Sequence, residues 1–307
     1  MKTFSHLKPH EFATLPRDRT WVLIPVGGIE DHGSHLPLGS DLMESRSLAA
    51  RLGERIEAEF AGHHSLLFPS AALNIDRQTT AASIRFRPHV LRDYLIDCVD
   101  SFHRQGFQYF AVVSGNYGPK QLTVIEEASQ ILAKRSKRFL FFTGKKSPKV
   151  LSLCSSDIEL EKKSRSLIWA DFPEHGGKRD TSLGLLFFPE HVESLSGLPG
   201  VELEKTGWSK KRALEQGELS GYWGTPSEAS SELGTRLADQ KIAQWLPLIA
   251  ASEKGVSSLN LINSRYAKIP LNYSLFMVWL MAFFILFFFM GWIYFSMLTL
   301  FQGAQLQ

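Results

Sequence analysis

The chain has 307 residues, of which 44% are apolar and 21% charged, a composition typical of a globular protein with one large core or two modest ones. The net charge is only +3, and the basic clusters alternate with acidic segments, so no nucleic-acid partner is expected. Cys98 and Cys154 lack the paired spacing of thiol metal sites, which favours a reduced, cytosolic environment. The first residues contain no apolar segment typical of a secretory signal, so export of the main domain is not expected.

Strand-like and helix-like segments alternate along the first half of the chain. The apolar runs of strand length are 21–26, 65–69, 107–113 and 139–142, and the segments with helical spacing are 42–56, 88–105 and 120–134. Strands that are apolar throughout and alternate with helices predict an α/β fold, with a mostly parallel central sheet covered by helices on both faces. Ligands of such sheets bind beyond the carboxyl ends of the strands, which here points to the loops after Val26 and Val113.

The last forty residues differ from the rest. No charged side chain follows Lys268, and the apolar run 275–301 exceeds the roughly 20 residues that cross a bilayer core. A buried core helix is the alternative, but such helices rarely run this long without a charge. Basic residues precede the run and none follows it, which places the main domain in the cytoplasm. We therefore expect a single-pass, tail-anchored membrane protein divided into a main domain (1–255), a juxtamembrane linker (256–272), a transmembrane helix (273–301) and a short tail (302–307).

The segment GIEDHGSHLPLGSD (28–41) is rich in metal-ligand side chains. In an extended segment Glu30 and His32 project to the same side, and Asp41 can fold back towards them after the intervening turn residues. Carboxylate and imidazole groups together suit zinc, manganese or iron. The alternative is that these are turn and capping residues, with Asp41 as the N-cap of a helix that begins at Leu42 and His35 bonded within the loop.

A second polar cluster, EHGGKRDTSLGLLFFP, occupies residues 174–189. His175 precedes a Gly-Gly turn, and Asp180 follows five residues later at the start of an apolar helix. A histidine and a carboxylate on a glycine-flanked loop are arranged like site residues. Asp180 can also be explained as an acidic residue that the helix dipole favours at a helix start.

Together the two clusters resemble a known family. The segment PVGGIEDHGSHLPLGSD resembles the metal-site signature of the creatininase family, PxGxxEQHGxHLPxxxD, without a gap. EHGGKRDTSLGLLFFPEHV and GYWGTPSEASSELG (221–234) are similar to two later blocks of that family, in the same order. The resemblance covers about residues 5 to 250.

The resemblance implies a three-layer α/β/α domain, commonly assembled into hexamers, with a two-metal centre that hydrolyses a non-peptide or cyclic C–N bond. By the family's pattern, Glu30 binds one metal, His32 binds the other, and Asp41 bridges them. His175 assists proton transfer or stabilises the tetrahedral intermediate. Asp180 takes the place of a glutamate that reaches the second metal. In such a centre the cations lower the pKa of water and polarise the carbonyl under attack.

The chain departs from the family in the loop after Val113. The family's block N-G-H-G-G-N, or N-G-H-Y-E-N in creatininase itself, is Ser-Gly-Asn-Tyr-Gly-Pro here, so Asn116 replaces a metal-binding histidine. An amide oxygen is a far weaker ligand for zinc than an imidazole. Asp180 is also one methylene shorter than the family's glutamate. Tyr117 and His35 are predicted to contact the substrate, but the glutamate that follows the tyrosine in creatininase is missing, so creatinine is not inferred.

We therefore expect one or two divalent ions per chain, with zinc first and manganese or iron as alternatives. The predicted ligands are Glu30, His32, Asp41, Asp180 and, weakly, Asn116; His32, Asp41 and Asp180 would suffice for one ion.

Two functions follow from these residues. The first is a metal-dependent amidohydrolase, predicted to use His175 and Asp180 in catalysis and to act on a small or cyclic amide. The second is a non-catalytic binding or scaffold protein that keeps the fold at the membrane. The expected partners are the small amide, the lipid bilayer and further copies of the chain. Because a membrane helix requires all C-termini to meet one bilayer, we expect an assembly smaller than a dihedral hexamer.

Overall fold

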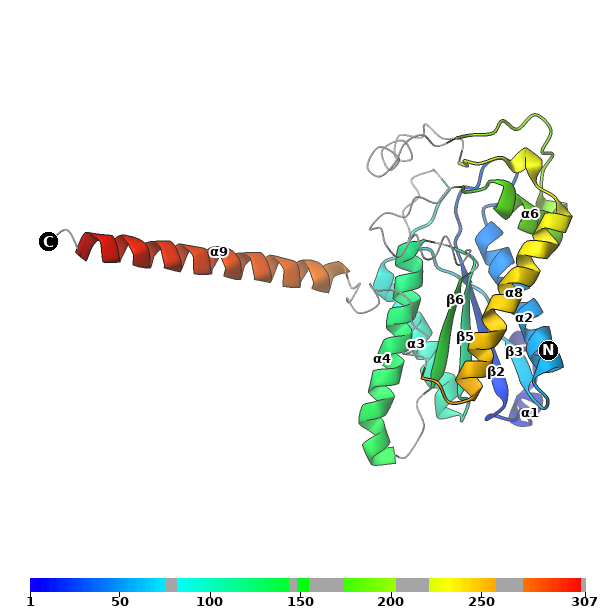
Figure 1. The fold of residues 1–307 in the computed structure, drawn as a ribbon. Coiled ribbons are helices and arrows are strands. Elements are labelled where there is room, and N and C mark those ends of the chain that lie inside the picture. Colours follow the sequence, from blue (N-terminus) through cyan, green and yellow to red (C-terminus); the bar gives the residue numbers. More distant parts are fainter. Residues whose placement is uncertain are drawn as a thin grey trace.

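The domain is built on a parallel sheet, drawn in Figure 1. The computed structural model describes residues 1–75, 82–116, 118–143, 148–154, 174–202, 221–257 and 273–304. The strand order is β1 (Lys2–Thr3), β3 (His64–Leu67), β2 (Thr20–Gly27), β5 (Tyr109–Ser114) and β6 (Lys149–Cys154), with the short β4 (Ala71–Ala72) paired to the end of β2. All of these strand pairs are parallel.

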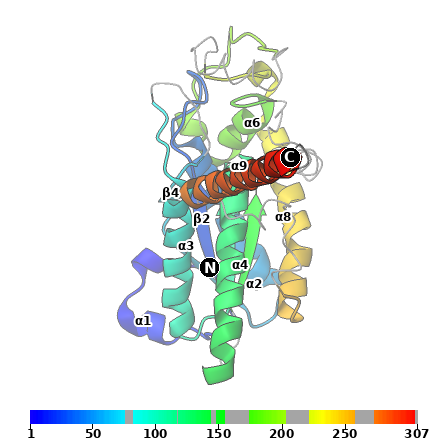
Figure 2. The same ribbon diagram turned by 90° about the vertical axis from the view of Figure 1, so that its left-hand side faces the viewer.

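Helices cover both faces of the sheet, as Figures 1 and 2 show. One face carries α3 (Pro88–Arg104) and α4 (Pro119–Thr143), with α1 (Pro9–Ala13) near its edge, and the other carries α2 (Ser40–Glu59), α6 (Lys178–Phe187) and α8 (Ser231–Glu253). The described residues also form the short 3-10 helices η1 (Phe4–His6), η2 (Pro189–His191) and η3 (Pro226–Glu228). The α/β/α layers and the parallel sheet confirm the predicted fold class.

The central strand β2 explains why the sequence shows apolar runs rather than alternation. Every residue of β2 is buried. Trp21 and Leu23 pack in the core beneath α2 and α8, whereas Val22 and Ile24 pack in the core beneath α3 and α4. A strand with a helical layer on each side has no solvent-facing positions, so both of its faces are apolar.

One predicted element is wrong. Residues 139–142 were expected to form a strand, but they lie in α4, which continues to Thr143. The strand beside β5 is β6, which begins at Lys149. A short apolar run suits a helix or a strand equally well. Between Pro119 and Gly144 no glycine or proline interrupts the helix, and the strand starts only after Pro148.

The apolar C-terminal run forms α9 (Tyr273–Ala304). Its segment Leu280–Met297 is long and apolar enough to cross a bilayer, and none of it is buried against the rest of the described chain. Figure 2 shows this helix nearly end-on, in front of the layered domain. By length and composition α9 is therefore a candidate membrane span. The predicted linker lies mostly outside the described residues.

Candidate metal centre

The site lies where neighbouring strands β2 and β5 end. Val26 is paired with Ser114 in the sheet, and the backbone N–H of Gly115 donates to the carbonyl of Val26 at 2.9 Å. The loops that carry Glu30 and Asn116 therefore leave the sheet side by side. This is the location that the carboxyl-end rule for parallel sheets predicts.

Two glycines bring the start of α2 against these strand ends. A Cβ atom at Gly27 would lie 2.4 Å from the backbone nitrogen of Leu42, and one at Gly115 would lie 2.0 Å from the carbonyl oxygen of Asp41. Only glycine permits this approach, which places Asp41 beside both loops. The alternative interpretation of Asp41 as an N-cap is wrong, because α2 begins at Ser40 and its N-cap is Gly39.

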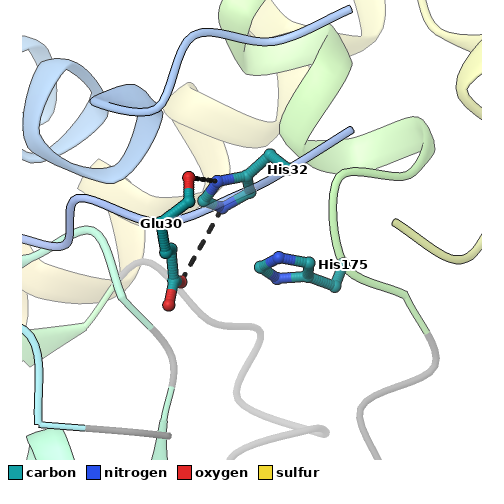
Figure 3. A group of neighbouring side chains, drawn as sticks. All are labelled: Glu30, His32 and His175. Carbon is teal, nitrogen blue, oxygen red and sulfur yellow. Dashed lines mark hydrogen bonds and ion pairs between the residues drawn. The ribbon is translucent and has the colours of Figure 1, made fainter. Parts of the chain in front are cut away.

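Three side chains converge at this point, as Figure 3 shows. Glu30, His32 and His175 each offer a ligand atom, and these atoms lie within 4.8 Å of one another. Glu30 and His32 are each only 2% exposed, and His175 is partly buried. The Nε2 atom of His32 lies 3.2 Å from Oδ1 of Asp41 and 3.9 Å from Oε1 of Glu30. A second carboxylate thus adjoins the three-residue group.

Backbone carbonyls orient both imidazoles. The Nδ1 atom of His32 lies 3.1 Å from the carbonyl oxygen of Glu30, and the Nε2 atom of His175 lies 2.8 Å from that of Asp31. In the neutral ring, the nitrogen that faces a carbonyl carries the proton, so the other nitrogen holds the lone pair that can bind a metal. The two rings stack with centroids 4.2 Å apart, and Trp223 stacks on the other side of His175 at 4.9 Å.

The charge balance of the group favours a cation. Burial alone would lower the pKa of His32, but the carboxylates of Asp41 and Glu30 outweigh it and raise the pKa to about 10. Burial, together with the neighbouring charge on His32, lowers the pKa of His175 to about 4. A site that draws a proton onto a buried imidazole lacks positive charge, which a divalent ion supplies when it displaces that proton. The residues present therefore fit a zinc or manganese ion.

Asn116, predicted as a weak ligand, lies beside Glu30 and Asp41, and its amide group faces these carboxylates with its nitrogen. Nδ2 donates to Oε1 of Glu30 at 2.9 Å and to Oδ2 of Asp41 at 3.1 Å. The side-chain oxygen instead accepts from the backbone N–H of Gly118 at 2.7 Å. Tyr117, the predicted substrate contact, lies outside the described residues.

Asp180 and His35 hold the loop that carries His175. The Oδ2 atom of Asp180 accepts from the backbone N–H of Gly176 at 2.7 Å. His35 places its Nε2 atom 2.9 Å from the carbonyl oxygen of Gly176 and 2.9 Å from Oγ1 of Thr181, and burial lowers its pKa. Asp180 does not belong to the three-residue ligand group found among the described residues, where His175 stands instead.

Sequence reasoning missed two residues of the site. Asn74 is 1% exposed and donates from Nδ2 to Oε2 of Glu30 at 2.5 Å. Asn74 follows β4, and a strand of two residues leaves no recognisable pattern in the sequence. Had β4 been predicted, the carboxyl-end rule would have pointed to the loop that carries Asn74. Trp223, which stacks on His175, lies in the block GYWG that carries part of the family resemblance.

A parallel α/β domain with carboxylates and imidazoles gathered beyond its strand ends is a candidate metal-binding protein. The family model of creatinine amidohydrolases, Creatininase, matches residues 5–249. The chain belongs to the creatininase family.

Solved structures agree in fold. A crystal structure of creatinine amidohydrolase (creatininase) has a TM-score of 0.63 and 20% identity, covering 83% of this chain and 98% of the other. A putative creatinine amidohydrolase from Bacteroides fragilis gives 0.59 and 18%, covering 82% and 96%. A structure named "Creatininase Mn" gives 0.61 and 20%, covering 82% and 98%. At such identities the likeness shows the fold alone. A comparison with curated proteins found no significant match.

Proposed function

We propose that the protein is a metal-dependent amidohydrolase that cleaves a C–N bond of a small or cyclic amide. The observation that carries the proposal is the convergence of Glu30, His32 and His175, with Asp41 adjoining them. Membership of the creatininase family supports it. Zinc or manganese is the proposed ion, because solved relatives are named "Creatininase Mn" and "Zn-Zn type".

The chain's own residues would divide the work as follows. A bound divalent ion lowers the pKa of a water molecule towards neutrality and polarises a carbonyl. Glu30 and Asp41 supply the negative charge that holds such an ion. His175, with its pKa lowered to about 4, is neutral at pH 7, so its ring can ligate an ion without first losing a proton, and we keep it as a candidate catalytic residue. Asp180 fixes the backbone beside His175 through Gly176, and we keep it as a candidate catalytic residue.

The test uses the full-length protein in detergent, loaded with zinc or manganese. A panel of lactams, cyclic imides, creatinine and linear amides is incubated with it, and products are followed by mass spectrometry. We expect hydrolysis of at least one cyclic amide, loss of that activity in His32→Ala, and no loss in His64→Ala, which changes an exposed histidine at the start of β3. Metal binding without hydrolysis of any compound, or unchanged turnover in His32→Ala, would contradict the proposal.

The alternative function is a non-catalytic binding or scaffold protein at the membrane. The observation that favours it is Asn116, a neutral residue whose amide nitrogen donates to both Glu30 and Asp41. Metal analysis after purification without chelators separates the two functions. Protein that retains no metal, and that takes up none when zinc is added, would support the scaffold.

We also propose that residues 273–301 anchor the protein in a bilayer as a single pass, with domain 1–255 on the cytoplasmic side, linker 256–272 between them and tail 302–307 beyond. The candidate span Leu280–Met297 supports the anchor, and the basic residues that precede it support the orientation. Deletion of 280–297 should move the protein from the membrane fraction to the soluble fraction. In sealed inside-out vesicles the domain should be open to protease, and protection would contradict the orientation.

We expect an assembly of copies smaller than a hexamer, because all anchors must enter one bilayer. The mass of the detergent-solubilised protein, measured by light scattering, tests this expectation. A hexamer would contradict it.

A further inference from the structure

Three hydrogen bonds to described residues together fix the direction of the amide group of Asn116. Its nitrogen donates to Glu30 and Asp41, and its oxygen accepts from the N–H of Gly118. The side chain belongs to a residue only 5% exposed, so bulk water cannot readily replace these partners. The amide therefore links two carboxylates on one side to the backbone on the other.

The opposite amide orientation is chemically unfavourable. Rotating the group by half a turn would place its oxygen against the oxygens of Glu30 and Asp41, and its N–H groups against the N–H of Gly118. Each of the three contacts would then join two acceptors or two donors, and buried polar groups left in that state are costly. An amide nitrogen has no lone pair available for a metal ion. In the observed orientation Asn116 therefore cannot act as a ligand.

The carboxylate of Glu30 accepts a hydrogen bond from an amide group at each of its two oxygens. Asn116 donates to Oε1 at 2.9 Å and Asn74 donates to Oε2 at 2.5 Å. Both donors are neutral and both are buried. Each oxygen of the Glu30 carboxylate thus accepts a hydrogen bond from one of these amides. His32 and His175 contribute their ligand atoms to the same group as Glu30.

We propose that the amide of Asn116 takes the place of one of two cations, so that the protein binds a single divalent ion per chain at Glu30, His32 and His175. The inference rests on the proposed metal-dependent function and narrows it. Asn116 acts as a positioning residue: its two hydrogen bonds keep Glu30 and Asp41 together, a task that a second cation performs when a histidine ligand stands at this position.

The experiment measures metal content of the full-length protein in detergent. Protein is saturated with ZnCl2, desalted, and analysed for zinc per chain by mass spectrometry. We expect one zinc ion in the unmodified protein, one in Asn116→Ala, which adds no ligand, and two in Asn116→His, which adds an imidazole. Two ions in the unmodified protein would overturn the single-ion inference while leaving the proposed function standing. No bound ion would overturn the proposed function itself.

A second measurement does not depend on the variants folding. Unmodified protein saturated with Mn²⁺ is examined by electron paramagnetic resonance. We expect the six-line spectrum of an isolated manganese ion. The multiline spectrum of an exchange-coupled pair would overturn the inference.

The zinc content of Asn116→His gives a further check. If this variant melts like the unmodified protein but binds a single ion, the inference is overturned, because the added imidazole would then not face a second metal position.

Discussion

Replacement of Gly115 by alanine tests whether the close approach of the β5 loop to α2 holds the site together. The added Cβ would lie 2.0 Å from the carbonyl oxygen of Asp41 and 2.8 Å from its carbonyl carbon. Both are backbone atoms, so no side-chain rotation relieves the clash, and the start of α2 must retreat by about 1 Å or more. Overpacking of this kind costs about 1–3 kcal/mol, and a backbone clash belongs at the upper end.

For a domain of this size, about 3 kcal/mol corresponds to a fall in Tm of about 6–12 °C. Circular dichroism of the full-length protein in detergent measures it. Gly39→Ala is the matched control, because its Cβ would meet nothing closer than 3.8 Å, and its expected cost is below about 1 kcal/mol. Zinc content should fall in Gly115→Ala, since the carboxylate of Asp41 beside His32 moves and its negative charge no longer helps to hold the ion, and it should stay unchanged in Gly39→Ala. Equal melting temperatures for the two variants would refute the reasoning.

Three further outcomes follow from the site. Because the pKa of His32 is raised to about 10, zinc binding at pH 7 should release about one proton per ion. An imidazole with an unshifted pKa would release about a quarter of a proton per ion. Calorimetry in buffers of different ionisation enthalpy measures the number of protons released, and the lower value would contradict the raised pKa. Trp223→Ala removes the ring stacked on His175 and should weaken zinc binding up to about tenfold, whereas Trp223→Phe should largely retain the affinity. Equal zinc affinities of Trp223→Ala and the unmodified protein would show that the stacked ring does not contribute to metal binding. Burial and the charge of Asp180 raise the pKa of Glu174 to about 7 in the folded protein, so this carboxyl group loses its proton at lower pH in the unfolded chain. The free energy of unfolding should therefore fall by about 1–3 kcal/mol as the pH rises from 4.5 to 7. Denaturation of Glu174→Gln should lack this loss, and parallel pH profiles of the two proteins would contradict the raised pKa.

The sequence predicted the layers and the location of the site for a physical reason. Strand β2 is buried on both faces, so its apolar run is visible without any partner, and Glu30 and His32 follow within five residues of its end. Because ligands bind beyond the carboxyl ends of parallel strands, this loop and the loop after β5 were predicted to share one site. The run 139–142 was misassigned because four apolar residues do not distinguish a helix from a strand.

Contacts between distant segments could not be predicted. Asn74 and Asn116 meet Glu30 from loops more than forty residues away, and His175 reaches His32 across more than one hundred and forty residues. No spacing rule carries such information, because the sheet order and the packing of α2 decide which loops adjoin. The approach at Gly115 is of this kind: the glycine is visible in the sequence, but its partner is not.

The sequence by itself therefore determined the α/β fold, the family motifs and the residue types gathered for metal chemistry, because these depend on local apolar runs and fixed spacings. Only the tertiary structure decided which side chains share one point and which way the amide of Asn116 faces. Whether a neutral amide donates or ligates depends on the partners around it, and here those partners are Glu30, Asp41 and the backbone of Gly118.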